Sequence, residues 1–161
     1  MVEVMPFRVR CMFASIVIAA SVALVEQMPA SADNSDVPAA ETRCVQGSDD
    51  PHASPAKVYK DCQAAAKLFR SMFSQASPAD QGLITTNLAL FEFYEAHALD
   101  GLKGPGSGDE LRANAKTLFS TVSQHDPDVK VRSHAKDALK CFYGGDQNAC
   151  ERAFSASSTS F

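Results

Sequence analysis

The sequence predicts an all-α fold: four main helices paired as two helical hairpins, in a bundle or a short α-solenoid, with a short C-terminal helix and disulfide bonds. Three observations support this prediction. Apolar residues between 54 and 143 recur with the spacing of amphipathic helices, and no segment keeps the alternation typical of strands. Ser-Pro and Asp-Pro pairs mark helix starts. Four cysteines follow residue 32, and an even number favours disulfides in an exported chain.

The length and the charge of the chain limit what it can be. Its 161 residues suit one domain. The 15 Lys and Arg residues against 19 Asp and Glu residues give a net charge of −4. A general nucleic-acid binder needs a basic excess that neutralises phosphates. We therefore expect no nucleic-acid partner.

Residues 1–32 have the features of a secretory signal peptide. Arg8 and Arg10 precede an apolar run over residues 12–25, and Ala30-Ser31-Ala32 offers small residues for cleavage after Ala32. The run is shorter than the roughly 20 residues that span a bilayer core, so we expect no stable membrane anchor. The alternative is an uncleaved anchor helix. The expected location is the periplasm or the outside of the cell.

Two segments are expected to be flexible: a leader over residues 33–53 and a tail over residues 155–161. Between them lies the predicted helical domain, 54–154. The leader is rich in Asp and Pro and has few large apolar side chains. Such a segment cannot bury enough apolar surface to offset the entropy lost on ordering.

The first helix is expected to begin at Ser54, with Pro55 in its first turn, where the missing N–H costs nothing. The polar face of this helix carries Lys57, Lys60 and Lys67. These lysines form either a solvated helix face or a surface for an acidic partner. The apolar face comprises Val58, Cys62, Ala65, Phe69, Met72 and Phe73.

The second helix is expected to begin at Ser77-Pro78 and to continue to Leu102. It is apolar on most sides, which is typical of a central helix covered by its neighbours. Phe93 and Leu99 lie away from its main apolar stripe. They form either an exposed binding patch or a contact with a later helix.

The remaining helices follow a glycine-rich loop over residues 101–108. The third is expected to begin at Ser107, which has capping-box spacing to Glu110. The fourth is expected to begin at Asp126-Pro127 and to end at Gly144-Gly145, and a short fifth helix follows to about Phe154.

Removing the signal peptide removes Cys11 and leaves Cys44, Cys62, Cys141 and Cys150. Two local disulfides are the preferred pairing. Cys44–Cys62 would pin the leader to the first helix, and Cys141–Cys150 would hold the fifth helix on the fourth. The alternative joins Cys62 to Cys141 and so connects the two hairpins.

Residues 126–142 resemble the second helix of a HEAT-type repeat, with its Asp-Pro turn, Val-Arg pair and Ala-Leu ending. Asp126 and Arg132 match the polar pair that fixes the turn in that family. The resemblance implies a helical-hairpin protein that binds other proteins and has no chemistry of its own. The inward positions of the repeat are matched by Val131, Ala135, Ala138 and Leu139.

No pattern in the sequence predicts catalysis, a metal site or a cofactor, so we do not expect an enzyme. Histidine and cysteine spacings match no zinc motif. Glu95 and His97 are two residues apart on one helix and so point in different directions. Glu92 and Asp100 are expected to face solvent. Ser133 is adjacent to His134 and cannot serve as its nucleophile partner.

These features favour a small exported helical module that binds another protein, for example an inhibitor or immunity protein of the cell envelope. An acidic surface would suit a basic cleft. The alternative function is a carrier of a small apolar ligand. Its cavity would be lined by Phe69, Phe73, Phe91, Phe93 and Tyr94.

Overall fold

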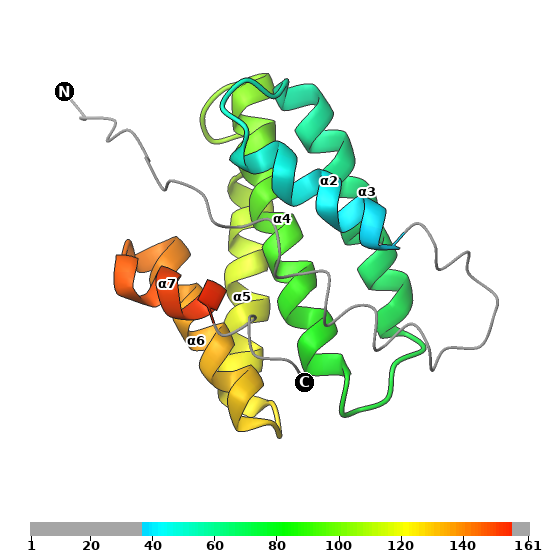
Figure 1. Cartoon of the computed structure of the whole chain (residues 1–161), viewed down its shortest axis with the longest axis vertical. Helices are drawn as coiled ribbons and strands as arrows, with labels where there is room; N and C mark the ends of the chain where they lie inside the picture. Colours follow the sequence, from blue (N-terminus) through cyan, green and yellow to red (C-terminus); the bar gives the residue numbers. More distant parts are fainter. Residues whose placement is uncertain (1–36, 156–161) are drawn as a thin grey trace.

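The computed structural model describes residues 37–155, and this part of the chain is helical with no strand (Figure 1). The all-α prediction is confirmed for these residues. The predicted signal peptide and the last residues of the predicted tail, 156–161, lie outside the described residues. The six helices are α2 (Val37–Asp49), α3 (Pro55–Phe73), α4 (Gln81–Lys103), α5 (Asp109–His125), α6 (Val129–Gly144) and α7 (Gln147–Ser155).

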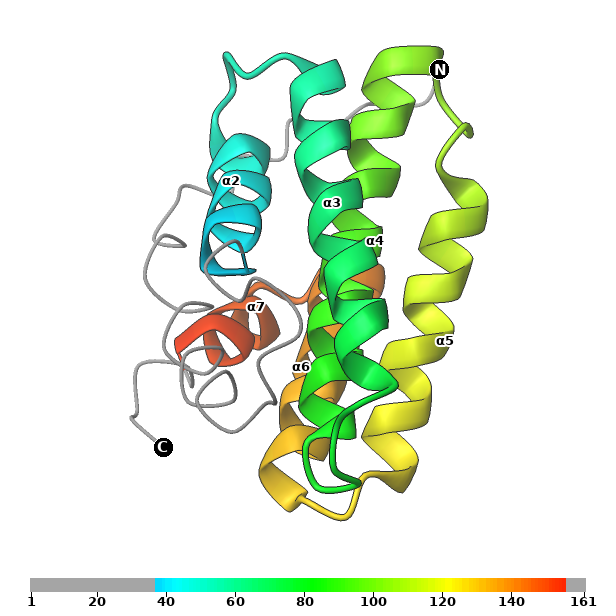
Figure 2. The same ribbon diagram turned by 90° about the vertical axis from the view of Figure 1, so that its right-hand side faces the viewer.

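Each helix packs against the next one along the chain, and α4 lies at the centre. The three long helices α3, α4 and α5 lie alongside one another (Figure 2). Helix α2 lies across α3 and also contacts α4, whereas α6 packs against α5 and α4. Helix α7 covers one end of α6. The prediction that the second main helix is central is confirmed, since α4 contacts α2, α3, α5 and α6.

Helix α4 contributes to two separate parts of the hydrophobic core. On one side Ile84 and Phe91 pack with Phe69 of α3 and with the apolar residues of α2. On the other side Ala89 and Leu90 pack with residues of α5 and α6. A helix that faces two cores must be apolar on both sides, which explains the weak amphipathic pattern of its sequence.

Residues 37–49 form helix α2, so the expectation of a flexible leader over residues 33–53 is corrected for this part. Ala40, Cys44 and Val45 are buried against α3. Ala40 and Cys44 are one turn apart on the same face, and Val45 lies on the adjoining face. The composition of this segment does not predict the helix. A 13-residue helix is marginal in water, and α2 becomes stable only through tertiary contacts and a disulfide.

The first predicted helix start is confirmed, and the second is displaced. Ser54 is the N-cap of α3, with Pro55 in the first turn. Helix α4 begins at Gln81, later than the predicted Ser77. The intervening residues form a turn in which the Ser77 hydroxyl donates to the Asp80 carboxylate at 2.6 Å. The serine therefore stabilises the turn and not the helix end.

The starts of α5 and α6 are displaced by one or two residues. Gly108 is the N-cap of α5, so the predicted capping box at Ser107 does not form. Asp128 is the N-cap of α6 and accepts a hydrogen bond from the Lys130 N–H at 2.7 Å. The predicted cap, Asp126, lies two residues earlier in the turn.

The glycine-rich loop between α4 and α5 is fixed by Asp100. This residue was expected to face solvent. The Asp100 carboxylate accepts the Gly108 N–H at 2.8 Å and pairs with Arg112 at 2.6 Å. Arg112 also pairs with Asp109 at 2.5 Å. The half-buried Asp100 thus ties the end of α4 to the start of α5.

Asp126 joins the turn between α5 and α6 to the start of α4. Its buried carboxylate accepts the Asp128 N–H at 2.8 Å and lies against Gly82, in the first turn of α4. A negative charge is favourable at this end of a helix. Arg132 donates to the main-chain carbonyls of Asp126 and Pro127, so it holds the turn through the backbone.

We predict that Gly82→Ala destabilises the protein. A methyl group at this position would overlap the Asp126 carboxylate. Overpacking of this kind costs about 1–3 kcal/mol, which exceeds the gain in helix propensity. Urea unfolding measures the difference. The matched control is Gly144→Ala, since no atom lies within 4 Å of that added methyl group. Equal stability of the two variants would contradict the prediction.

Candidate functional site

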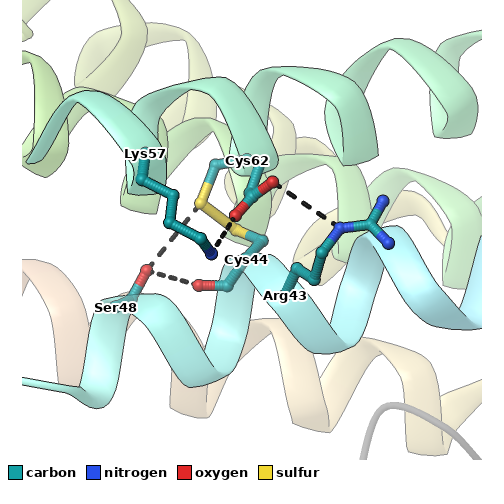
Figure 3. Close-up of polar contacts among 6 residues, drawn as sticks. Arg43, Cys44, Ser48, Lys57 and Cys62 are labelled. Atoms are coloured by element: carbon teal, nitrogen blue, oxygen red, sulfur yellow. Dashed lines mark hydrogen bonds and ion pairs between the residues drawn. A yellow bond between two sulfur atoms is a disulfide. The ribbon is translucent and has the colours of Figure 1, made fainter. Parts of the chain in front are cut away.

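The four cysteines form two disulfides that attach the two short terminal helices to the rest of the fold. Cys44–Cys62 joins α2 to α3 (Figure 3), and Cys141–Cys150 joins α6 to α7. The preferred local pairing is confirmed, and the alternative Cys62–Cys141 bond is wrong. The Ser48 hydroxyl donates to the Cys44 carbonyl at 2.8 Å and lies 3.8 Å from the Cys62 sulfur.

Ion pairs accompany both disulfides. In Figure 3, Lys57 and Arg43 approach the same carboxylate, that of Asp61, at 2.9 and 3.6 Å. Arg152 of α7 pairs with Asp137 of α6 at 2.8 Å. Exposed pairs of this type contribute about 0–1 kcal/mol each. The disulfides and the apolar contacts of α2 and α7 therefore contribute more than these ion pairs to holding the two helices in place.

The residues predicted as candidate interaction surfaces lie on two helices, α3 and α4. Lys57, Lys60 and Lys67 are exposed on α3, where Lys57 pairs with Asp61. Phe93 of α4 is half-buried, and its ring centroid lies 4.4 Å from that of Phe142 on α6. Phe93 therefore packs against a later helix. This contact was the alternative to an exposed binding patch. Leu99 is half-buried on α4.

The aromatic residues predicted to line an apolar cavity pack into different parts of the core. Phe69 and Phe91 contact each other, with ring centroids 5.2 Å apart. Phe93 and Tyr94 contact Phe142 on the other side of α4. Phe73 is 41% exposed at the end of α3. The structure thus brings Phe69 and Phe91 together on one side of α4 and Phe93 and Tyr94 with Phe142 on the other, and it leaves Phe73 apart from both groups.

Glu92 is buried, so the expectation that it faces solvent is wrong. One carboxylate oxygen accepts from Arg70 of α3 at 2.5 Å, and the other accepts from Asn114 of α5. Its side chain is 1% exposed. Since α4 is apolar on most sides, any polar residue in its middle meets a neighbouring helix. A charged residue in the middle of such a helix is therefore a signal in the sequence for a buried polar contact. Its partners, Arg70 and Asn114, become identifiable only from the helix packing.

Glu95 is a second buried carboxylate, one turn further along α4. One oxygen accepts from Gln63 at 3.5 Å, and the other has no hydrogen-bond partner. Burial raises the pKa of Glu95, against the opposing effects of the Arg70 charge and the Gln63 hydrogen bond, and the Glu92 charge raises it further. His97 is exposed, which confirms that it and Glu95 point in different directions.

A groove lies between α5 and α6, and the sequence did not predict it. We call it the α5–α6 groove. Its volume is about 630 Å³. Tyr143 forms part of one wall, where its hydroxyl donates to the Arg112 carbonyl at 2.8 Å and the Lys116 ammonium lies 5.5 Å from its ring centroid. The groove is lined by Lys116, Thr117, Ser120, Thr121, Gln124, His125, Leu139, Lys140, Tyr143 and Gly144.

Comparison of the chain with protein-family models, curated proteins and solved structures finds no match. Over residues 37–155 no helix is both long enough and apolar enough to cross a bilayer. In the same part of the chain no three His, Cys, Asp or Glu side chains are grouped so as to hold a metal ion.

We predict that Glu95→Gln stabilises the protein at alkaline pH and not at acidic pH. Because the pKa of Glu95 is raised on folding, its contribution to stability is complete below about pH 4.5 and is lost as the pH rises through the folded pKa. A neutral glutamine avoids this loss. We expect the melting temperature to rise by about 4 °C at pH 8 and to be unchanged at pH 4.

Thermal melts of the two proteins between pH 4 and pH 8 measure this difference. Asp49, whose pKa is raised to about 6 by burial, titrates in the same range but is present in both proteins. The control variant is Glu151→Gln, at an exposed position of α7. A Glu95→Gln variant that is less stable than the wild type at pH 8 would show that its charge is stabilising.

We predict that removing the Cys44–Cys62 disulfide releases α2 while the rest of the fold persists. The cysteines are 18 residues apart, and closing a loop of this length contributes about 3 kcal/mol. In the double variant Cys44→Ser and Cys62→Ser, the amides of α2 should lose protection from hydrogen exchange. The amides in the middle of α4 serve as the internal control. Unchanged protection of α2 would contradict the prediction.

Proposed function

We propose that the chain is an exported helical module that binds another protein in the periplasm or outside the cell and acts through that binding. The two disulfides support an oxidising location, because disulfides persist in such compartments and are rare in the cytosol. The signal-peptide features of residues 1–32 point to the same compartments.

The observation that carries the proposal is the covalent attachment of both short terminal helices. Helices α2 and α7 have 13 and 9 residues, too few to be stable alone. Each is held by one disulfide against a longer helix. A surface fixed before binding loses less entropy when a partner docks. This is a useful property for a binding protein.

Two further features support binding by helical pairs. Residues 126–142 resemble a HEAT-type repeat, whose hairpins bind other proteins. In this chain Arg132 holds the preceding turn through the carbonyls of Asp126 and Pro127. The proposed arrangement is two helical hairpins, α3–α4 and α5–α6, which contact each other through α4 and α5.

Within this proposal, an inhibitor or immunity protein of the cell envelope is the more specific form. Its net charge of −4 favours association with a basic cleft and speeds diffusional encounter at low salt. The apolar-ligand carrier is not pursued, since the proposed aromatic lining residues are divided between the two sides of α4 and Phe73 is exposed.

Affinity capture tests the proposal. The mature chain, residues 33–161, is immobilised in its oxidised form and exposed to envelope and culture-medium fractions of the producing cells. We expect a protein that is retained by oxidised bait and lost when the bait is reduced and alkylated. That protein should then bind saturably in purified form. Recovery of no such protein from either fraction would contradict the proposed function.

A further inference from the structure

We propose that the α5–α6 groove binds an acidic, extended peptide segment of the partner protein. This inference rests on the proposed function and adds the chemical class of the bound segment. A volume of about 630 Å³ is within the range of ligand sites, about 300–1,000 Å³. The groove is therefore large enough for several residues of an extended peptide.

The charge of the groove is opposite to that of the chain. Lys116 of α5 and Lys140 of α6 both line the groove, and His125 lies in the same lining. None of the ten lining residues is acidic, although the chain has a net charge of −4. Within the described residues neither lysine has a carboxylate at ion-pair distance. Carboxylates of a bound segment would provide those partners.

The hydroxyl groups of the groove favour a peptide over a phosphate ligand. Thr117 and Thr121 donate their hydroxyl protons to carbonyls of their own helix, both at 3.0 Å. The lone pairs of these oxygens remain able to accept hydrogen bonds. Peptide N–H groups would supply such donors, whereas a fully ionised phosphate group has only acceptors. Lysines and acceptor hydroxyls together match an acidic peptide.

The walls of the groove are fixed before binding. The Tyr143 ring is held by its hydrogen bond to the Arg112 carbonyl and by the Lys116 ammonium above it. Lys140 is adjacent to Cys141, whose disulfide to Cys150 attaches α7 to this end of α6. A rigid groove loses little conformational entropy on binding.

Fluorescence anisotropy with labelled peptides tests the inference. The probes are an octapeptide of alternating Glu and Ala and its counterpart of alternating Lys and Ala. We expect saturable binding of the acidic peptide and at least tenfold weaker binding of the basic one. The double variant Lys116→Gln and Lys140→Gln should weaken binding of the acidic peptide at least tenfold. Both lysines are exposed, and circular dichroism would verify that the variant is folded.

The matched control is the double variant Lys103→Gln and Lys136→Gln, which removes two exposed lysines that do not line the groove. It should change the affinity less than twofold. Equal weakening by both pairs would overturn the inference, because binding would then reflect overall charge. Competition by tripolyphosphate or by anionic phosphatidylserine vesicles as effective as that by the unlabelled peptide would also overturn it. In that case the groove would be a general anion site.

Affinity capture with the same variants separates this inference from the proposed function. If the wild type and the Lys116→Gln and Lys140→Gln variant retain a partner equally well, the groove inference fails and the proposed function stands. If the variant alone loses the partner, both are supported. If neither retains a partner, the proposed function fails, and so does the inference that rests on it.

Discussion

Helix α4 has to be covered around most of its circumference, because its 23 residues carry apolar side chains on most sides. No single neighbour can do this. Helix α3 covers one side and α5 another, while α2 and α6 complete the cover. The other helices are thus arranged by the need to remove α4 from water, and the core consists of two clusters that share this helix.

The buried charge of Glu92 makes that arrangement specific. Apolar packing alone would tolerate small shifts of one helix along another. Glu92 does not tolerate such shifts, because its two carboxylate oxygens accept hydrogen bonds from Arg70 of α3 and Asn114 of α5. A misaligned helix would leave the buried Glu92 carboxylate without one of these partners, which is unfavourable. Asp100 fixes the end of α4 through its hydrogen bond from the Gly108 N–H, and the Asp126 carboxylate of the α5–α6 turn lies against Gly82 at the start of α4.

Local features of the fold could be predicted from the sequence, whereas features that depend on helix packing could not. The Ser54-Pro55 start follows from a signal within two residues, and the central position of the second main helix follows from its own apolar pattern. The sequence favoured the observed cysteine pairs but left Cys62–Cys141 as an alternative. Helix α2 was missed because its apolar residues Ala40, Cys44 and Val45 are stabilised only by contact with α3.

The candidate site was less predictable than the fold. The α5–α6 groove is formed by residues of two helices, and Lys116 and Lys140 are unremarkable surface residues until the two helices are placed side by side. Glu92 and Phe93 are adjacent in sequence, yet one contacts α3 and α5 while the other contacts α6. Only the helix packing determines which neighbour each residue meets.

The central claim is that the chain crosses a membrane and is then oxidised into this helical body. The most direct measurement is intact-mass and non-reducing peptide analysis of the protein isolated from its own cells. We predict a chain that begins at Asp33, with one linked peptide pair containing Cys44 and Cys62 and another containing Cys141 and Cys150. A chain that begins at Met1 and has free thiols at these four positions would contradict the account.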